Sequence, residues 1–198
     1  MPKVEPIINI ENIVASATVK HGIELNSVVK AFPDAEYHPG RFPGLVFQLK
    51  KPRTSTLIFS SGKMICTGAR SEKEAERALR KLVKVLKEGG ILILGKPEIK
   101  IVNVVATVNL RGAVDLLELY ESERGMRGRI VYEPEQFPGL IYRMDSPKAV
   151  FLIFSSGKLV CTGAKKGEDV HQAVVKLYEK LEDKNLIRHN TKLFLLNF

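Results

Sequence analysis

Covalent or metal chemistry in this 198-residue chain could involve its two cysteines, its four histidines and a repeated Ser-Ser-Gly-Lys motif. Cys66 and Cys161 are too few and too far apart in the sequence for a disulfide framework or a zinc site. The Ser-Ser-Gly-Lys words lack the G-x-x-x-x-G-K-[ST] spacing of a phosphate-binding loop, and they favour a turn between strands. The histidines do not have ligand spacing; they are His21, His38, His171 and His189. We therefore expect no enzyme, no cofactor and no metal site.

Charge gives the first indication of a partner. The chain has 31 Lys and Arg residues against 22 Asp and Glu, a net charge of +9 and a pI near 9.5. No apolar run approaches the roughly 18 residues of a membrane span, and the first ten residues lack a signal-peptide pattern. These features predict a soluble protein of a reducing compartment with no membrane partner. They point weakly to an anionic partner.

The sequence contains an internal repeat with two copies. Residues 37–69 align without a gap on residues 132–164, with 18 identities in 33 positions. The shared words are F-P-G-L, L-I-F-S-S-G-K and C-T-G-A, and upstream N-I-V-A matches N-V-V-A. The change of offset between these matches falls in residues 121–128, a charged stretch that is typical of a loop insertion. We predict a first repeat over residues 7–94, a second over 95–186 and a tail over 187–198.

Each copy shows the same coarse order of elements. A β-branched run (7–19 and 99–108) precedes a short helical patch (25–32 and 114–120), and three or four short strands follow. Each copy then closes with an amphipathic helix, which in the first copy starts at the capping-box pair Ser71 and Glu74. This order predicts an α+β fold, an antiparallel sheet with helices on one face.

The strands are apolar on both faces. Leu57 and Phe59 share one face of their strand and Ile58 takes the other, because side chains alternate along a strand. Helices on one side would leave the second apolar face open, and a large open apolar face usually marks a binding surface. Basic residues cluster around the same strands. An apolar centre with a cationic rim suits the DNA minor groove, where phosphates flank a floor with few hydrogen-bonding groups.

With these paired sequence motifs, the chain resembles the TATA-box-binding protein family of archaea and eukaryotes over roughly residues 7–186. The resemblance implies a saddle, in which a curved ten-stranded antiparallel sheet made of two pseudo-symmetric repeats carries four helices on its convex face. It also implies a general transcription initiation factor that binds the TATA element of promoters through the minor groove of double-stranded DNA. In that family paired phenylalanines kink the duplex.

The resemblance assigns roles to residues of this chain by motif. The DNA wedges are Phe42, Phe59, Phe137 and Phe154. The residues that contact bases or form the groove floor are Asn12, Asn103, Thr67, Thr162, Val14, Val105, Leu57, Leu152, Ile65 and Val160. The phosphate contacts are Ser61, Lys63, Arg70, Arg143, Ser156, Lys158 and Lys165. Gln48 stands where the family often has Arg, which predicts a weaker hold on phosphate in the first repeat.

The loops that precede Phe42 and Phe137, the first wedge residue of each repeat, differ in charge. Residues 37–41 read Y-H-P-G-R, whereas residues 132–136 read Y-E-P-E-Q. In the family the second loop receives transcription factor B, so the resemblance assigns Glu133 and Glu135 to that contact. It further implies recruitment of the RNA polymerase pre-initiation complex. The expected compartment is the cytoplasm, with the nucleoid, for an archaeal source, and the nucleus for a eukaryotic one.

Other interpretations remain open at this point. The same duplicated fold could serve as a binding module for a protein or an apolar ligand, although paired Phe and Asn residues argue against it. A nucleic-acid-processing enzyme on a related fold would need an acidic or metal-binding cluster, which the sequence lacks. A dimer off DNA is also open. For the apolar C-terminal tail, packing on the body and self-association are both open roles.

Overall fold

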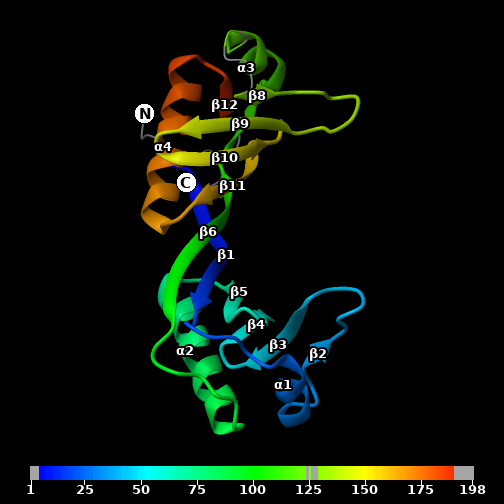
Figure 1. The fold of residues 1–198 in the computed structure, drawn as a ribbon. Helices are drawn as coiled ribbons and strands as arrows, with labels where there is room; N and C mark the ends of the chain where they lie inside the picture. Colours follow the sequence, from blue (N-terminus) through cyan, green and yellow to red (C-terminus); the bar gives the residue numbers. More distant parts are fainter. Residues whose placement is uncertain (1–4, 124, 126–128, 190–198) are drawn as a thin grey trace. The chain divides into compact units, whose positions relative to one another are not determined.

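The structure is a computed structural model that describes residues 5–123, 125 and 129–189. Its elements follow one order twice (Figure 1). The first copy comprises β1 (Ile7–Thr18), α1 (Leu25–Ala31), β2 (Glu36–Tyr37), β3 (Gly44–Lys50), β4 (Arg53–Phe59), β5 (Lys63–Ala69) and α2 (Glu72–Glu88). The second comprises β6 (Glu98–Asn109), β7 (Gly112–Val114), α3 (Leu116–Ser122), β8 (Ile130–Val131), β9 (Leu140–Asp145), β10 (Lys148–Ile153), β11 (Lys158–Ala164) and α4 (Gly167–Asp183). A last strand, β12 (Ile187–His189), follows α4.

Ten of the strands form one antiparallel sheet in the order β2-β3-β4-β5-β1-β6-β11-β10-β9-β8. The predicted α+β class, with ten antiparallel strands and four helices, is confirmed. By their contacts the described residues divide into two compact units. The first unit contains residues 11–103, and the second contains residues 104–189 together with 5–10. β12 pairs with β7 in a separate two-stranded sheet, which the sequence patterns did not predict.

Helices cover one face of the strands in each unit. α2 packs on β5, and α4 packs on β11 and β10. In β5 the side chains of Met64 and Cys66 are fully buried, whereas Ile65 and Thr67 between them are only half-buried. The same alternation recurs in β11. Because neighbouring side chains point to opposite faces, the half-buried set marks the face without a helix.

Local sequence signals explain where the long helices begin. Ser71 is the N-cap of α2, and its hydroxyl accepts a hydrogen bond from the Glu74 N–H at 3.1 Å. The Glu74 carboxylate accepts from the Arg70 N–H at 2.8 Å, so both residues of the predicted capping box satisfy orphan backbone donors. At the equivalent position of α4 stands Lys166, which makes no side-chain cap. Acidic residues in its first turn, Glu168 and Asp169, still favour that helix terminus electrostatically.

The repeated glycine words form turns and bulges. Gly62 ends the Ser-Ser-Gly turn with φ +87°, and its N–H donates to the Phe59 carbonyl at 3.0 Å. A Cβ at Gly62 would lie 2.3 Å from the His21 carbonyl oxygen, so any larger residue would clash with backbone there. Gly68 and Gly163 also have positive φ, beside the register shifts where β5 and β11 pair with β1 and β6. The shared Gly residues are therefore required by the backbone.

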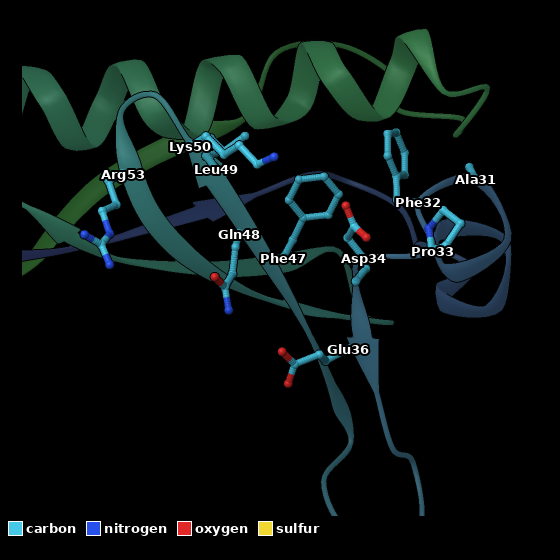
Figure 2. A pocket seen from close by; sticks show the side chains of 11 residues that line it. Ala31, Phe32, Pro33, Asp34, Glu36, Phe47, Gln48, Leu49, Lys50 and Arg53 are labelled. Carbon is cyan, nitrogen blue, oxygen red and sulfur yellow. The ribbon is translucent and has the colours of Figure 1, made fainter.

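The two units differ in one part of their cores. In the first unit the rings of Phe32 and Phe47 pack edge to face, with centroids 5.2 Å apart; Figure 2 shows both rings on the side of β3 that faces the helix. A Cβ at Gly89 would lie 2.3 Å from Phe32, so the end of α2 closes directly on this ring. The contact at this site is therefore made by two aromatic rings.

The equivalent site of the second unit holds an ion network. Glu123 is only 3% exposed, although it follows α3 in a stretch whose composition predicts a solvated loop. Its carboxylate meets the Lys180 Nζ at 2.8 Å and the Lys184 Nζ at 2.6 Å. Lys180 also donates to the Tyr142 hydroxyl at 2.8 Å. Burial alone would raise the pKa of the Glu123 carboxyl, but the two ammonium groups outweigh burial and hold the pKa below its ordinary value.

No helix among the described residues is long and apolar enough to cross a membrane.

We predict that Glu123→Gln lowers the free energy of unfolding by about 2 kcal/mol at pH 7, because it leaves two partly buried ammonium groups without their carboxylate. The pKa of Glu123 is lower in the folded chain than its ordinary value of 4.5. Its contribution is therefore complete above that value and is lost as the pH falls through the folded pKa. Urea unfolding followed by circular dichroism at pH 7 and in acid measures both effects.

Glu88→Gln is the matched control, because its i,i+4 pair with Lys84 has side chains 63% and 76% exposed. That substitution should change the free energy of unfolding by less than about 0.5 kcal/mol. A Glu123→Gln protein as stable as wild type at pH 7 would contradict the stabilising role of the network.

Candidate nucleic-acid interface

Each unit presents one pair of phenylalanine rings beside the open face of its sheet. Phe42 precedes β3 and Phe59 ends β4, and their centroids are 6.0 Å apart with the rings inclined at 67°. Phe137 and Phe154 repeat this arrangement at 6.0 Å and 62°. Phe42 is 41% exposed and Phe137 is 43% exposed, while their partners are half-buried. An exposed apolar ring that recurs at the same position in both units is unusual for a core residue and typical of a contact surface.

A buried glycine explains how each ring pair is placed. A Cβ at Gly44 would lie 2.7 Å from the Phe42 ring and 3.0 Å from the Phe59 ring. The equivalent distances at Gly139 are 2.6 Å to Phe137 and 3.1 Å to Phe154. The F-P-G-L word therefore supplies both a ring and the space in which two rings approach the backbone.

The loops that carry the first ring of each pair share one backbone turn. The N–H groups of Arg41 and Phe42 donate to the His38 carbonyl at 2.9 and 3.0 Å. In the second unit the N–H groups of Gln136 and Phe137 donate to the Glu133 carbonyl, both at 2.9 Å. The side chains of the residues in both turns are exposed, including that of Glu135. The two turns therefore present opposite charge on the same backbone.

Asn12 of β1 is fixed by hydrogen bonds to the end of β5. Its Oδ1 accepts from the Gly68 N–H at 2.8 Å and from the Thr67 hydroxyl at 3.1 Å, and its Nδ2 donates to the Thr67 Oγ1 at 2.9 Å. A side-chain amide has two N–H donors, so the second N–H of Asn12 can donate to an acceptor outside the protein. Asn103 of β6 and Thr162 of β11 occupy the equivalent positions in the repeat.

Apolar side chains form the open face between these polar groups. Leu57 lies opposite Ile65 across β4 and β5, and Leu152 lies opposite Val160 across β10 and β11. All four are half-buried, as are Val14 and Val105. The structure thus brings together the predicted floor residues within each unit. Four further residues lie on the same face of these strands and were missed by the sequence analysis, although the alternation of side chains could have identified them. They are Val46, Ser55, Ile141 and Val150.

A hollow of about 690 Å³ adjoins Phe154 in the second unit. Thr107, Asn109 and Lys158 line it together with Val160. Thr107 and Asn109 were absent from the predicted site, because a Thr and an Asn near a strand end carry no motif. Their polar groups extend the open face toward its rim.

The residues predicted to contact phosphate are all exposed: Ser61, Lys63, Arg70, Arg143, Ser156, Lys158 and Lys165. None of them has an ion pair with a carboxylate among the interactions that the described residues show. Gln48 is exposed on β3 where Arg143 stands on β9.

A second hollow, of about 560 Å³, lies in the first unit away from the ring pairs (Figure 2). Its lining includes Phe32, Phe47 and Leu49 together with the charged side chains of Asp34 and Arg53. The lining shows no arrangement of nucleophile and base.

The thiols do not provide reactive chemistry. Burial raises the pKa of Cys161 to about 12. Burial also raises the pKa of Cys66, against hydrogen bonds from Thr56 and Thr54 that lower it. Both thiols are therefore neutral at physiological pH and buried. Among the described residues no group of three or more His, Cys, Asp or Glu could hold a metal ion.

These features define a duplicated α+β protein with an open apolar sheet face that is edged by paired aromatic rings. The family model described as "Transcription factor TFIID (or TATA-binding protein, TBP)" matches residues 7–89 and 98–184. The chain belongs to this TATA-binding protein family.

Relatives agree with this assignment. The TATA-box-binding protein of Pyrobaculum calidifontis is 51% identical over 90% of this chain and 87% of its own length. That of Sulfolobus acidocaldarius is 46% identical over 92% of this chain and 90% of its own. Among solved structures, Methanococcus jannaschii TBP superposes with a TM-score of 0.77 at 46% identity, covering 89% of this chain and 98% of that one.

We predict that Gly44→Ala displaces the Phe42 ring while costing less than about 1 kcal/mol of stability, because an exposed ring can move away from the added methyl group. Loss of the nuclear Overhauser contacts between Phe42 and Phe59 would report the displacement. Gly40→Ala is the control, since a Cβ there meets nothing within 4 Å. Unchanged ring contacts in Gly44→Ala would show that the glycine does not set the ring geometry.

Proposed function

We propose that the chain is a general transcription initiation factor that binds the TATA element of promoters in the minor groove and kinks it with its phenylalanine pairs. The observation that carries this proposal is the ring pair beside an open apolar face, present once in each unit at the same 6.0 Å spacing. Membership of the TATA-binding protein family supports it. No step of this function requires catalysis or a cofactor.

The composition of the open face supports readout of A·T pairs. In the minor groove both orientations of an A·T pair present only acceptors, whereas G·C adds the exocyclic amine of guanine as a donor. Val14, Leu57 and Ile65 provide no acceptor for that amine, and burial of an unpaired donor is costly. Asn12, with an N–H free to donate, suits the acceptors that A and T present.

The ring pairs are suited to act as wedges. An apolar ring inserted between two base pairs partly unstacks them and bends the duplex toward the major groove. Phe42 and Phe137 leave water on insertion, which favours the bent complex. The glycine beneath each pair holds the rings against the backbone, so few degrees of freedom are lost on binding.

The acidic loop of the second unit provides a surface for a protein partner. Glu133 and Glu135 are exposed beside a ring that would contact DNA, where carboxylates would repel phosphate unless basic groups met them. We assign this loop to transcription factor B, with recruitment of RNA polymerase as the consequence. Off DNA, the open face could pair with a second copy of the chain. The relatives named above are archaeal, so we place the protein in the cytoplasm with the nucleoid.

A mobility-shift titration tests the proposed function directly. We expect a shift on an A·T-rich promoter fragment and at least tenfold weaker binding, about 1.4 kcal/mol, when G·C pairs replace the element. Affinity should also fall linearly on a logarithmic scale with salt concentration, because phosphate contacts release counterions. Equal affinity for both fragments at every salt concentration would refute minor-groove readout.

Phe154→Ala should reduce DNA bending and weaken binding by about 1–3 kcal/mol, because one wedge ring of the second unit is lost. Fluorescence transfer between dyes at the two ends of the fragment measures the bend. Leu117→Ala on α3, where the side chain is 62% exposed and outside the open face, is the control and should leave the bend unchanged. Fluorescence transfer equal to that of the wild type with Phe154→Ala would contradict the assignment of this ring as a wedge.

Glu133→Arg should leave the binding of TATA DNA intact and weaken recruitment of transcription factor B by roughly tenfold or more, because an acidic contact becomes basic. A supershift with purified transcription factor B measures this effect. His38→Arg places the same new charge on the equivalent turn of the first unit and serves as the control. Identical supershifts for Glu133→Arg and wild type would exclude this loop as the partner surface.

A further inference from the structure

The outer side of α4 carries a groove that the proposed function does not use. Its lining comprises His171, Val175, Tyr178 and Glu179 of α4 with Glu5, Pro6 and Ile8 at the start of the chain, and its volume is about 260 Å³. A shallower hollow on the same helix shares His171, Val175 and Glu179. Val175 is 42% exposed at the point that both hollows share. Val175 is therefore an apolar side chain of α4 that no described segment covers.

The described chain ends beside one end of this groove. The Leu186 N–H donates to the Leu181 carbonyl at 2.8 Å. Three residues later the His189 ring meets the Glu182 carboxylate at 2.5 Å and lies 6.3 Å from the Tyr178 ring. The last described residue thus lies beside Tyr178, which also lines the groove. Tyr178, Val175 and His171 share one helical face, since residues three and four apart are neighbours.

We propose that the C-terminal segment, residues 190–198, binds this groove of its own chain. The segment lies outside the described residues, and its sequence is N-T-K-L-F-L-L-N-F. From Tyr178 to His171 the groove spans about 10 Å of helix axis, whereas nine residues can reach about 30 Å. The reach is therefore sufficient from the point where the described chain ends.

The chemistry of the segment matches the groove. Its leucines and phenylalanines suit the apolar floor at Val175 and Tyr178, and the charge of Lys192 complements the acidic residues Glu5 and Glu179 of the lining. β12 holds the start of the segment in place, because its pairing with β7 fixes the chain up to His189. Docking from a fixed point loses less chain entropy than capture of a separate peptide.

Alkylation of an introduced thiol tests this proposal. In the full chain with Val175→Cys, we expect iodoacetamide to react about tenfold more slowly than in the same variant shortened to end at His189. The native thiols of Cys66 and Cys161 are buried and should not contribute. Leu117→Cys, an exposed position on α3, is the control and should react equally in the two lengths. Equal rates for Val175→Cys in both lengths would overturn the proposal.

A second variant separates docking from any effect of shortening the chain. The full-length protein carrying Val175→Cys with Leu193→Asp and Phe194→Asp should react as fast as the shortened chain. Retention of slow alkylation in this protein would refute binding through the apolar residues. Protection that rises with protein concentration would instead assign the groove to a second copy and overturn the intramolecular proposal. DNA binding is measured in parallel, and its loss or retention bears only on the proposed function.

Discussion

In the described part of each unit, helices cover one face of the strands and leave the other face open, and this open face is the constraint on which the other features of the molecule depend. Burial of Met64 and Cys66 under α2 stabilises the unit, while Ile65 and Thr67 on the same strand remain in partial contact with water. Apolar groups left in water carry a free-energy cost that a ligand can remove. The two alternating sets of side chains on the same strands therefore divide between the core and the proposed binding face.

Duplication preserves this face, whereas charge and core packing distinguish the two units. The two ring pairs have the same spacing and both rest on a glycine. The aromatic contact of Phe32 with Phe47 is replaced in the second unit by the buried Glu123 and its lysines. Residues 1–95 carry 15 basic and 9 acidic side chains, whereas residues 96–198 carry 16 and 13. The first half is therefore the more cationic, and the acidic loop accounts for part of that difference.

The sequence predicted the features that repeat or alternate, because repetition and period are visible in a linear chain. Alternation separated Ile58, which is buried, from Leu57 and Phe59 on the opposite face, and the capping pair placed the start of α2. The loop predicted for residues 121–128 was wrong at its start, since α3 extends through Ser122 and Glu123 is buried, whereas residues 124 and 126–128 lie outside the described residues. A buried carboxylate depends on Lys180 and Lys184, some 60 residues away, and no local pattern reports such a pairing.

The same distinction applies to the site: sequence motifs identify its residues, whereas their orientation depends on the folded structure. The F-P-G-L word identified the rings, but the need for Gly44 follows only from the approach of two rings to one backbone position. Likewise Asn12 was found by its repeat partner, whereas its orientation depends on the Gly68 N–H, which is available because β5 departs from regular pairing at this point. The positive φ of Gly68 belongs to this irregularity. A backbone irregularity thus orients the Asn12 amide in the first unit, and the matching register shift with a positive φ at Gly163 recurs in the second.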